Sequence, residues 1–168
     1  MHIPQSIEVR ATGLCIGIVT SRYHEEITTV LRQGAIEEFL RLGGDEDALV
    51  YSTTPGAFEL IAVVHAMAQR EEIDGVIALG CVIKGETDHD QFINQAVAHG
   101  LSEIMLRTGT PVGMGILTCD RYAQAEERSG GARGNKGRDA MGAALESIAR
   151  IRSLQDPADS ICPVTEEG

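Results

Sequence analysis

Residues 80–89, Gly-Cys-Val-Ile-Lys-Gly-Glu-Thr-Asp-His, combine the parts of an anion-binding site with a residue that can transfer protons. An apolar run from Gly75 to Ile83 is typical of a buried strand, and Lys84-Gly85 ends it just before a helical pattern begins. Free backbone N–H groups at the start of a helix favour an anion, above all phosphate. His89 would lie beside that anion, and a histidine can exchange protons near neutral pH. The segment therefore predicts a phosphate site with an acid–base residue next to it.

Further candidate residues follow the other predicted strands. Arg22 and Tyr23 follow the first strand, Pro55 to Glu59 follow the second, and Thr118 to Asp120 follow the fourth. In an open α/β sheet, ligands bind at the edge formed by the C-terminal ends of the strands. We therefore expect these groups to gather at one edge.

Each candidate also has an interpretation that involves no chemistry. Glu59, in the first turn of a predicted helix, would complement the helix dipole. Tyr23 and Phe58 would cover the core, Arg128 at a helix end would satisfy the last carbonyls, and His89 would be a solvated loop residue. The residues by themselves leave both interpretations open.

Strands and helices alternate along the predicted fold. The hydrophobic periodicity predicts strands over residues 14–20, 48–53, 75–83 and 112–117, and helices over 27–42, 58–70, 93–104, 122–128 and 141–148. Asp120 is the expected N-cap of the short helix. This order predicts a three-layer αβα sandwich around a four-stranded parallel sheet. Residues 7–11 alternate between apolar and polar, which predicts an extra N-terminal edge strand.

The bulk properties exclude several classes of protein. The 168 residues favour a single domain with a full core, an extended N-terminal segment over 1–12 and a flexible tail over 154–168. The net charge of −11 argues against nucleic-acid binding. There is no apolar run of membrane-spanning length and no signal-peptide pattern at the start, so a cytoplasmic location and no membrane partner are expected.

Common cofactor motifs are missing from the sequence. The four cysteines form no C-x-x-C pair and are expected to be reduced, and no Asp/Glu/His cluster predicts a metal. The glycine-rich stretch over 130–137 lacks the Ser/Thr that follows the lysine of a P-loop, and no G-x-G-x-x-G follows the first strand.

Four motifs together resemble the 6,7-dimethyl-8-ribityllumazine synthase family. They are Gly17-Ile18-Val19-x-x-Arg22-Tyr23, Pro55-Gly56-Ala57-Phe58-Glu59, Gly80-x-Val82-Ile83-Lys84-Gly85-x-Thr87-x-His89, and Gln124-Ala125-x-x-Arg128 followed by Gly134-Asn135-Lys136-Gly137. The resemblance covers residues 14–151 and implies a flavodoxin-like fold. It also implies a transferase of riboflavin biosynthesis, which condenses a ribitylamino-pyrimidinedione with 3,4-dihydroxy-2-butanone 4-phosphate, releases phosphate and water, and needs no cofactor.

The resemblance also implies roles for individual residues. His89 would be catalytic, and Glu86, Thr87 and Arg128 would bind phosphate. The remaining substrate-binding residues would be Tyr23, Ala57, Phe58, Glu59, Cys81, Val82, Ile83, Met114 and Lys136.

The family's assembly would place each active site between two subunits. The resemblance implies a pentamer or a shell of sixty subunits, in which Met114, Arg128 and Lys136 complete the neighbour's site. The short loop over 129–136 and the segment over 1–12 favour the shell, and riboflavin synthase is a candidate partner.

Some positions depart from the family pattern and keep alternatives open. Met114 replaces the usual phenylalanine, Asp90-Gln91-Phe92 replace an aromatic–acid–aromatic run, and Ile61 replaces a common proline. A weakly active or inactive paralogue, acting as a self-assembling shell or a flavin-binding protein, is therefore the alternative. A flavodoxin-like binding or signalling domain is the third, although no acidic cluster follows the first strand.

Overall fold

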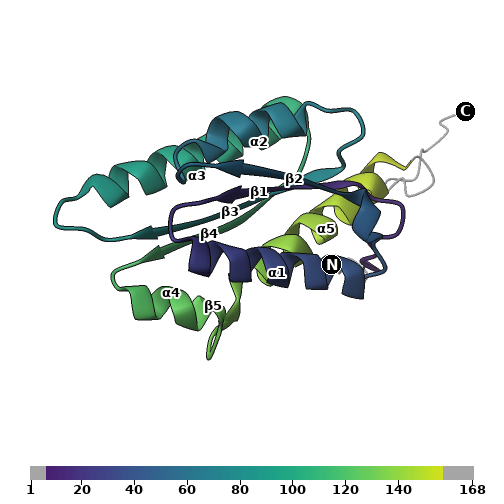
Figure 1. The fold of residues 1–168 in the computed structure, drawn as a ribbon. Coiled ribbons are helices and arrows are strands. Elements are labelled where there is room, and N and C mark those ends of the chain that lie inside the picture. Colours follow the sequence, from purple (N-terminus) through teal and green to yellow (C-terminus); the bar gives the residue numbers. More distant parts are fainter. Residues whose placement is uncertain (1–6, 157–168) are drawn as a thin grey trace, which may run out of the picture.

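A four-stranded parallel sheet with helices on both faces forms the centre of the chain (Figure 1). The computed structural model describes residues 7–156. The elements in chain order are β1 (Ile16–Ser21), α1 (Glu25–Arg41), the 3-10 helix η1 (Glu46–Ala48), β2 (Leu49–Thr54), α2 (Leu60–Ala68), β3 (Gly75–Ile83), α3 (His89–Thr108), β4 (Val112–Cys119), α4 (Tyr122–Arg128), β5 (Ser129–Gly131), β6 (Gly134–Asn135) and α5 (Lys136–Gln155).

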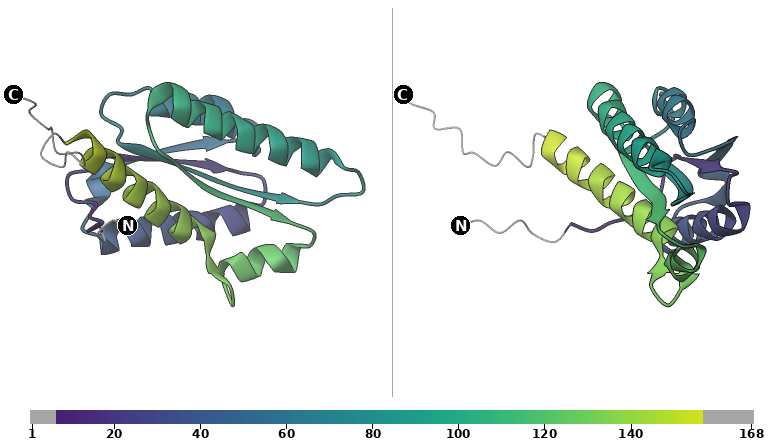
Figure 2. Two further views of the ribbon diagram at one scale, coloured as in Figure 1. Left: turned by 180° about the vertical axis from the view of Figure 1, so that it is seen from behind. Right: turned by 90° about the vertical axis from the view of Figure 1, so that its left-hand side faces the viewer.

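The strand order β2-β1-β3-β4 places β3 in the interior of the sheet. Helices α2 and α3 cover one face, and α1, α4 and α5 lie on the other, as the two views of Figure 2 also show. The predicted three-layer αβα sandwich is confirmed. Among residues 7–156, no helix is long and apolar enough to cross a membrane.

Strand β3 is apolar along its length because both of its faces are buried. Ile77 and Leu79 point into the core beneath α1 and α5, whereas Val76 and Ala78 point into the core beneath α2 and α3. The edge strand β4 alternates instead: Gly113 and Leu117 are buried, and Met114 between them is exposed.

The segment over 7–11 differs from its prediction. It forms no strand in the described chain; instead the Ala11 N–H donates to the Leu42 carbonyl at 2.9 Å, and Ala11 is fully buried. The segment thus packs against the end of α1 rather than pairing with the sheet. The alternation of apolar and polar residues over 7–11 reflects this one-sided packing. The rest of the extended N-terminal segment lies outside the described residues.

Two further predictions need correction. Arg121, not Asp120, is the N-cap of α4, and the Asp120 N–H donates to Gln124 Oε1 at 2.9 Å. The glycine-rich loop after α4 folds into the hairpin β5–β6. Residues 154–155 still belong to α5, and the rest of the predicted tail beyond 156 lies outside the described residues.

Asn135 joins the hairpin, α1 and the start of α5. Its amide nitrogen donates to the carbonyls of Val30 at 2.8 Å and Ser129 at 3.1 Å. Its amide oxygen accepts from the N–H groups of Gly137 at 2.8 Å and Arg138 at 3.2 Å, which caps α5. This single side chain therefore fixes where α5 begins.

Helices α1 and α5 approach closely at Gly137. A Cβ there would lie 1.9 Å from the Leu31 carbonyl oxygen, which is backbone and cannot rotate away. Gly142, one and a half turns further along α5, differs, since a Cβ there would meet only Glu38 Oε1 at 3.7 Å, an ordinary contact.

We predict that Gly137→Ala lowers the free energy of unfolding by about 1–3 kcal/mol, because the two helices must separate. Gly142→Ala is the matched control in the same helix, and should be neutral or stabilise by up to about 1 kcal/mol through helix propensity. Urea denaturation of both variants measures the difference. Equal stabilities for the two would contradict the close approach.

Candidate active site

The sheet has a step at its C-terminal edge. Pairing of β1 with β3 ends at Thr20 and Leu79, whereas pairing of β3 with β4 continues to Ile83 and Cys119. The end of β3 therefore has a neighbour on one side only. A pocket of about 840 Å³ lies at this step, and the last residues of β3, from Cys81 to Ile83, form part of its wall.

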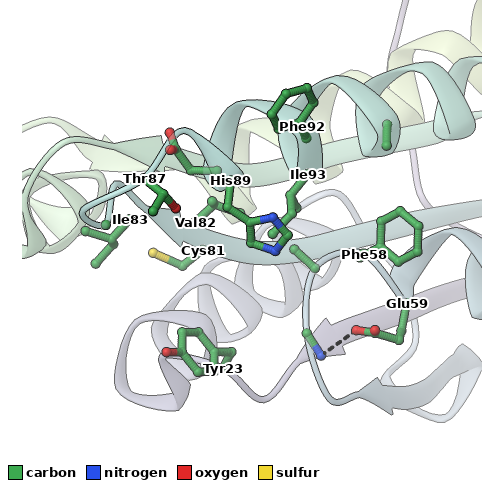
Figure 3. A pocket seen from close by; sticks show the side chains of 15 residues that line it. Tyr23, Phe58, Glu59, Cys81, Val82, Ile83, Thr87, His89, Phe92 and Ile93 are labelled. Atoms are coloured by element: carbon green, nitrogen blue, oxygen red, sulfur yellow. Dashed lines mark hydrogen bonds between the residues drawn. The ribbon is translucent and has the colours of Figure 1, made fainter.

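Three other segments complete the wall of the pocket (Figure 3). Tyr23 comes from the loop after β1, residues 56–59 come from the turn after β2, and His89 comes from the start of α3. In Figure 3, His89 lies between Tyr23 at the lower left and Phe58 and Glu59 at the right. Tyr23 is 67% exposed and Phe58 54%, so both aromatic rings are open to a ligand.

Hydrogen bonds between the loops after β1 and β2 fix their relative positions. The Arg22 N–H donates to the Thr54 carbonyl at 2.8 Å, and the Tyr23 N–H donates to the Pro55 carbonyl at 3.1 Å. The Thr54 hydroxyl donates to the Gly56 carbonyl at 2.8 Å. The backbone that carries Tyr23 is therefore tied to the turn that carries Ala57, Phe58 and Glu59.

Glu59 has a structural contact and a free acceptor. Its Oε2 accepts from the Gly56 N–H at 3.0 Å, which stabilises the turn before α2. Among the described residues, no hydrogen bond to Oε1 is formed. The carboxylate can hold the turn and still accept a hydrogen bond from a hydroxyl in the pocket.

The start of α3 has the features of an anion site. No side chain caps it: Asp88, at the N-cap, accepts from Gln91 Nε2 at 3.2 Å and makes no cap to the backbone. The first backbone N–H groups of a helix lack partners within the helix and carry partial positive charge. Gly85 and Thr87 line the pocket just before this turn, and His89 is the first helical residue.

Cys81 contributes an apolar wall rather than a nucleophile. Burial, with a smaller effect of the neighbouring Cys119, raises the pKa of the Cys81 thiol to about 12. Burial likewise raises the pKa of Cys119. Because the thiolate is the reactive form of cysteine, Cys81 is inert near neutral pH.

We predict that Cys81 in the folded protein is not alkylated by iodoacetamide at pH 8, where a pKa of about 12 leaves about one thiol in ten thousand ionised. Peptide mass spectrometry measures the modification, and the guanidinium-unfolded protein, which should react readily, is the control. Rapid modification of Cys81 in the folded state would contradict the burial and the raised pKa.

Comparison with known proteins places the chain in a family. The model of the 6,7-dimethyl-8-ribityllumazine synthase family matches residues 13–152. The chain belongs to this family. Enzymes named 6,7-dimethyl-8-ribityllumazine synthase from two strains of Thermus thermophilus are 40% identical over 144 residues, which cover 86% of this chain and 92% of theirs. The enzyme of that name from Rhodopirellula baltica is 45% identical over 133 residues, covering 79% of this chain and 86% of its own.

The predicted identification is thus confirmed. Lumazine synthases are transferases that catalyse the penultimate step of riboflavin biosynthesis, act on small molecules and, in general, assemble as oligomers. The structure brings eight of the predicted site residues into one pocket, namely Tyr23, Ala57, Phe58, Glu59, Cys81, Val82, Ile83 and His89, together with Thr87 of the predicted phosphate site.

Four other predicted residues do not line this pocket. Glu86 is exposed in the loop before α3. Met114 is 56% exposed on the face of β4 that lies on the α3 side. Arg128 Nη1 donates to the Gln124 carbonyl at 3.0 Å, and Lys136 Nζ lies 2.6 Å from Asp139 Oδ2.

The pocket also contains residues that were not predicted as part of the site. Asp90, Phe92, Ile93 and Ala96 line it from α3. Positions 89, 93 and 96 are spaced to lie on one face of a helix, and this spacing was the signal in the sequence. Asp90 Oδ1 is buried with no hydrogen-bond partner within the described residues.

Proposed function

We propose that this chain condenses 5-amino-6-ribitylamino-pyrimidinedione with 3,4-dihydroxy-2-butanone 4-phosphate to form 6,7-dimethyl-8-ribityllumazine. The observation that carries the proposal is the pocket at the step in the sheet, where one-sided strand backbone, exposed aromatic rings and an uncapped helix start meet. Family membership supports the same reaction.

The pocket offers a separate surface to each part of the pyrimidine substrate. Tyr23 would stack on the ring, since exposed aromatic faces favour offset or edge contacts with planar heterocycles. The backbone at Val82 and Ile83, which has no strand on the β1 side, would hydrogen-bond the polar edge of the ring. The ribityl chain would lie along Ala57 and Phe58, with a hydroxyl donating to Glu59.

The phosphate substrate would lie at the start of α3. The backbone of Glu86 and Thr87, with the Thr87 hydroxyl, would bind the phosphate group. An arginine adds charge-assisted hydrogen bonds to such a group, and we assign this role to Arg128. Lys136 would add positive potential, which matters in a chain with a net charge of −11.

His89 would act as the proton-transfer residue. Attack of the pyrimidine's primary amine on the ketone carbonyl requires protons to leave nitrogen and reach oxygen before water departs and the imine forms. Loss of phosphate and ring closure, with release of a second water, need further proton transfers. One imidazole beside both substrates can serve these steps in turn, while alignment of the two substrates supplies much of the rate.

We predict that His89→Ala lowers kcat by about 10- to 100-fold, because proton transfer loses its positioned group while substrate alignment is retained. Product formation, read from the absorbance and fluorescence of the lumazine, is the measurement. His99→Ala, an exposed histidine of the same helix outside the pocket, is the control. A kcat unchanged in His89→Ala would remove His89 from the mechanism. A folded, assembled protein with no activity above the spontaneous reaction would favour the alternative, a shell-forming or flavin-binding paralogue.

We further propose that the site is completed by a second copy of the chain. Met114, Arg128 and Lys136 lie away from the chain's own pocket, and Met114 is exposed, which supports their use in a neighbouring subunit. The assembly would be a pentamer, or a shell of such pentamers. Analytical ultracentrifugation distinguishes five chains of 18.0 kDa from sixty. Riboflavin synthase remains the proposed partner.

A mixing experiment tests the shared site. His89→Ala and Arg128→Ala should each keep at most about a tenth of the wild-type activity as homo-oligomers. In mixed oligomers, assembled by unfolding and refolding the variants together at equal amounts, about one interface in four would combine an intact His89 with an intact Arg128 from the neighbour. We predict recovery of about a quarter of the wild-type activity. No recovery in oligomers shown to be mixed would mean that both residues act within one chain.

A further inference from the structure

His24 has an unusual backbone conformation next to the pocket. Its φ of 57° and ψ of 52° lie in the left-handed region, and no other non-glycine residue among residues 7–156 has a positive φ. Only a few per cent of non-glycine residues adopt this region, with asparagine, aspartate and histidine the most frequent, and the conformation persists where the surroundings maintain it. His24 follows directly on Tyr23, the exposed aromatic residue of the pocket.

Backbone hydrogen bonds hold His24 in this conformation. Its carbonyl accepts from the N–H groups of Ile27 and Thr28, each at 3.0 Å, and so begins α1. The Thr28 hydroxyl donates to the Ser21 carbonyl at 2.8 Å, which ties the first turn of α1 to the end of β1. The left-handed residue therefore closes a tight connection between β1 and α1.

The imidazole of His24 makes ring contacts with two tyrosines. It contacts Tyr23 edge to face, with ring centroids 4.7 Å apart and planes at 73°. It also contacts Tyr122 of α4, with centroids 6.1 Å apart and planes at 60°. Both arrangements are of the kind that aromatic pairs favour. Among the described residues, no other ring contacts Tyr23.

We propose that His24 is a positioning residue for substrate binding. Its left-handed backbone turns the imidazole against the Tyr23 ring, and the contact with Tyr122 gives the imidazole a second aromatic neighbour. The Tyr23 ring is thereby held in one orientation, ready to stack on the planar heterocycle of the pyrimidine substrate. His24 does not itself line the pocket, so it acts through Tyr23. The inference rests on the proposed function, in which Tyr23 stacks on that heterocycle.

The role predicts a change in one kinetic parameter. His24→Asn keeps a residue that tolerates the left-handed conformation but removes the ring. We expect the KM for the pyrimidine substrate to rise by about three- to tenfold, which corresponds to one aromatic contact. The KM for 3,4-dihydroxy-2-butanone 4-phosphate should stay within about twofold of wild type, and so should kcat. His24→Phe, which keeps a ring against Tyr23, should restore the pyrimidine KM, and His99→Asn is the matched histidine control.

A double-mutant cycle with Tyr23→Ala separates the possible outcomes. If His24 acts through Tyr23, His24→Asn has no further effect on the pyrimidine KM once Tyr23 is alanine. Additive effects, or equal rises of both KM values, would overturn the positioning role. If Tyr23→Ala raises the pyrimidine KM and His24→Asn does not, the inference fails while the proposed function stands. If Tyr23→Ala has no effect, the assigned role of Tyr23 fails first and the inference fails with it.

Discussion

The unequal length of neighbouring strands is the constraint on which the site depends. Because β3 continues with β4 after β1 has ended, its last residues keep a partner on one side only. On the open side, the backbone N–H and C=O groups at the end of β3 lack the neighbouring strand that pairs with them elsewhere in the sheet. Buried backbone groups need hydrogen-bond partners. In the proposed function, the polar edge of the pyrimidine ring would meet this need. The position of the pocket therefore depends on the register of the strands more than on particular side chains.

The rest of the fold brings groups to this step. Parallel strands deliver the loops after β1 and β2 to the same edge, and hydrogen bonds from Arg22 and Tyr23 fasten one loop to the other. Helix α3 starts at the end of β3, so its first turn faces the same space. Rigid strands thus position the short segments that line the pocket.

Much of this was predictable from the sequence, for reasons that can be stated. Apolar runs and helical spacing predicted the strands and helices, and the glycine turn at 84–85 predicted where α3 would follow β3. The step was not predictable, since it depends on the register between strands far apart in sequence. The contact of His24 with Tyr23 depends on a left-handed backbone conformation at His24, which no pattern in the sequence indicates. Residues 7–11 alternate between apolar and polar as in a strand, but a segment that packs one side against α1 shows the same alternation. The proposed roles of Met114, Arg128 and Lys136 would require a second chain, whose placement depends on assembly as well as on the fold of one chain.

Asn135 also affects the order of the backbone at Lys136, the residue that follows it. A helix end usually frays, opening and closing independently of the core. Here the first amides of α5 are capped by a side chain that is also bonded to α1 and to the hairpin. Opening of this turn must disturb all three elements, so its amide hydrogens should exchange with solvent only through a large cooperative opening. The backbone that carries Lys136 is ordered when the chain folds, and that ordering need not be repeated each time a ligand binds.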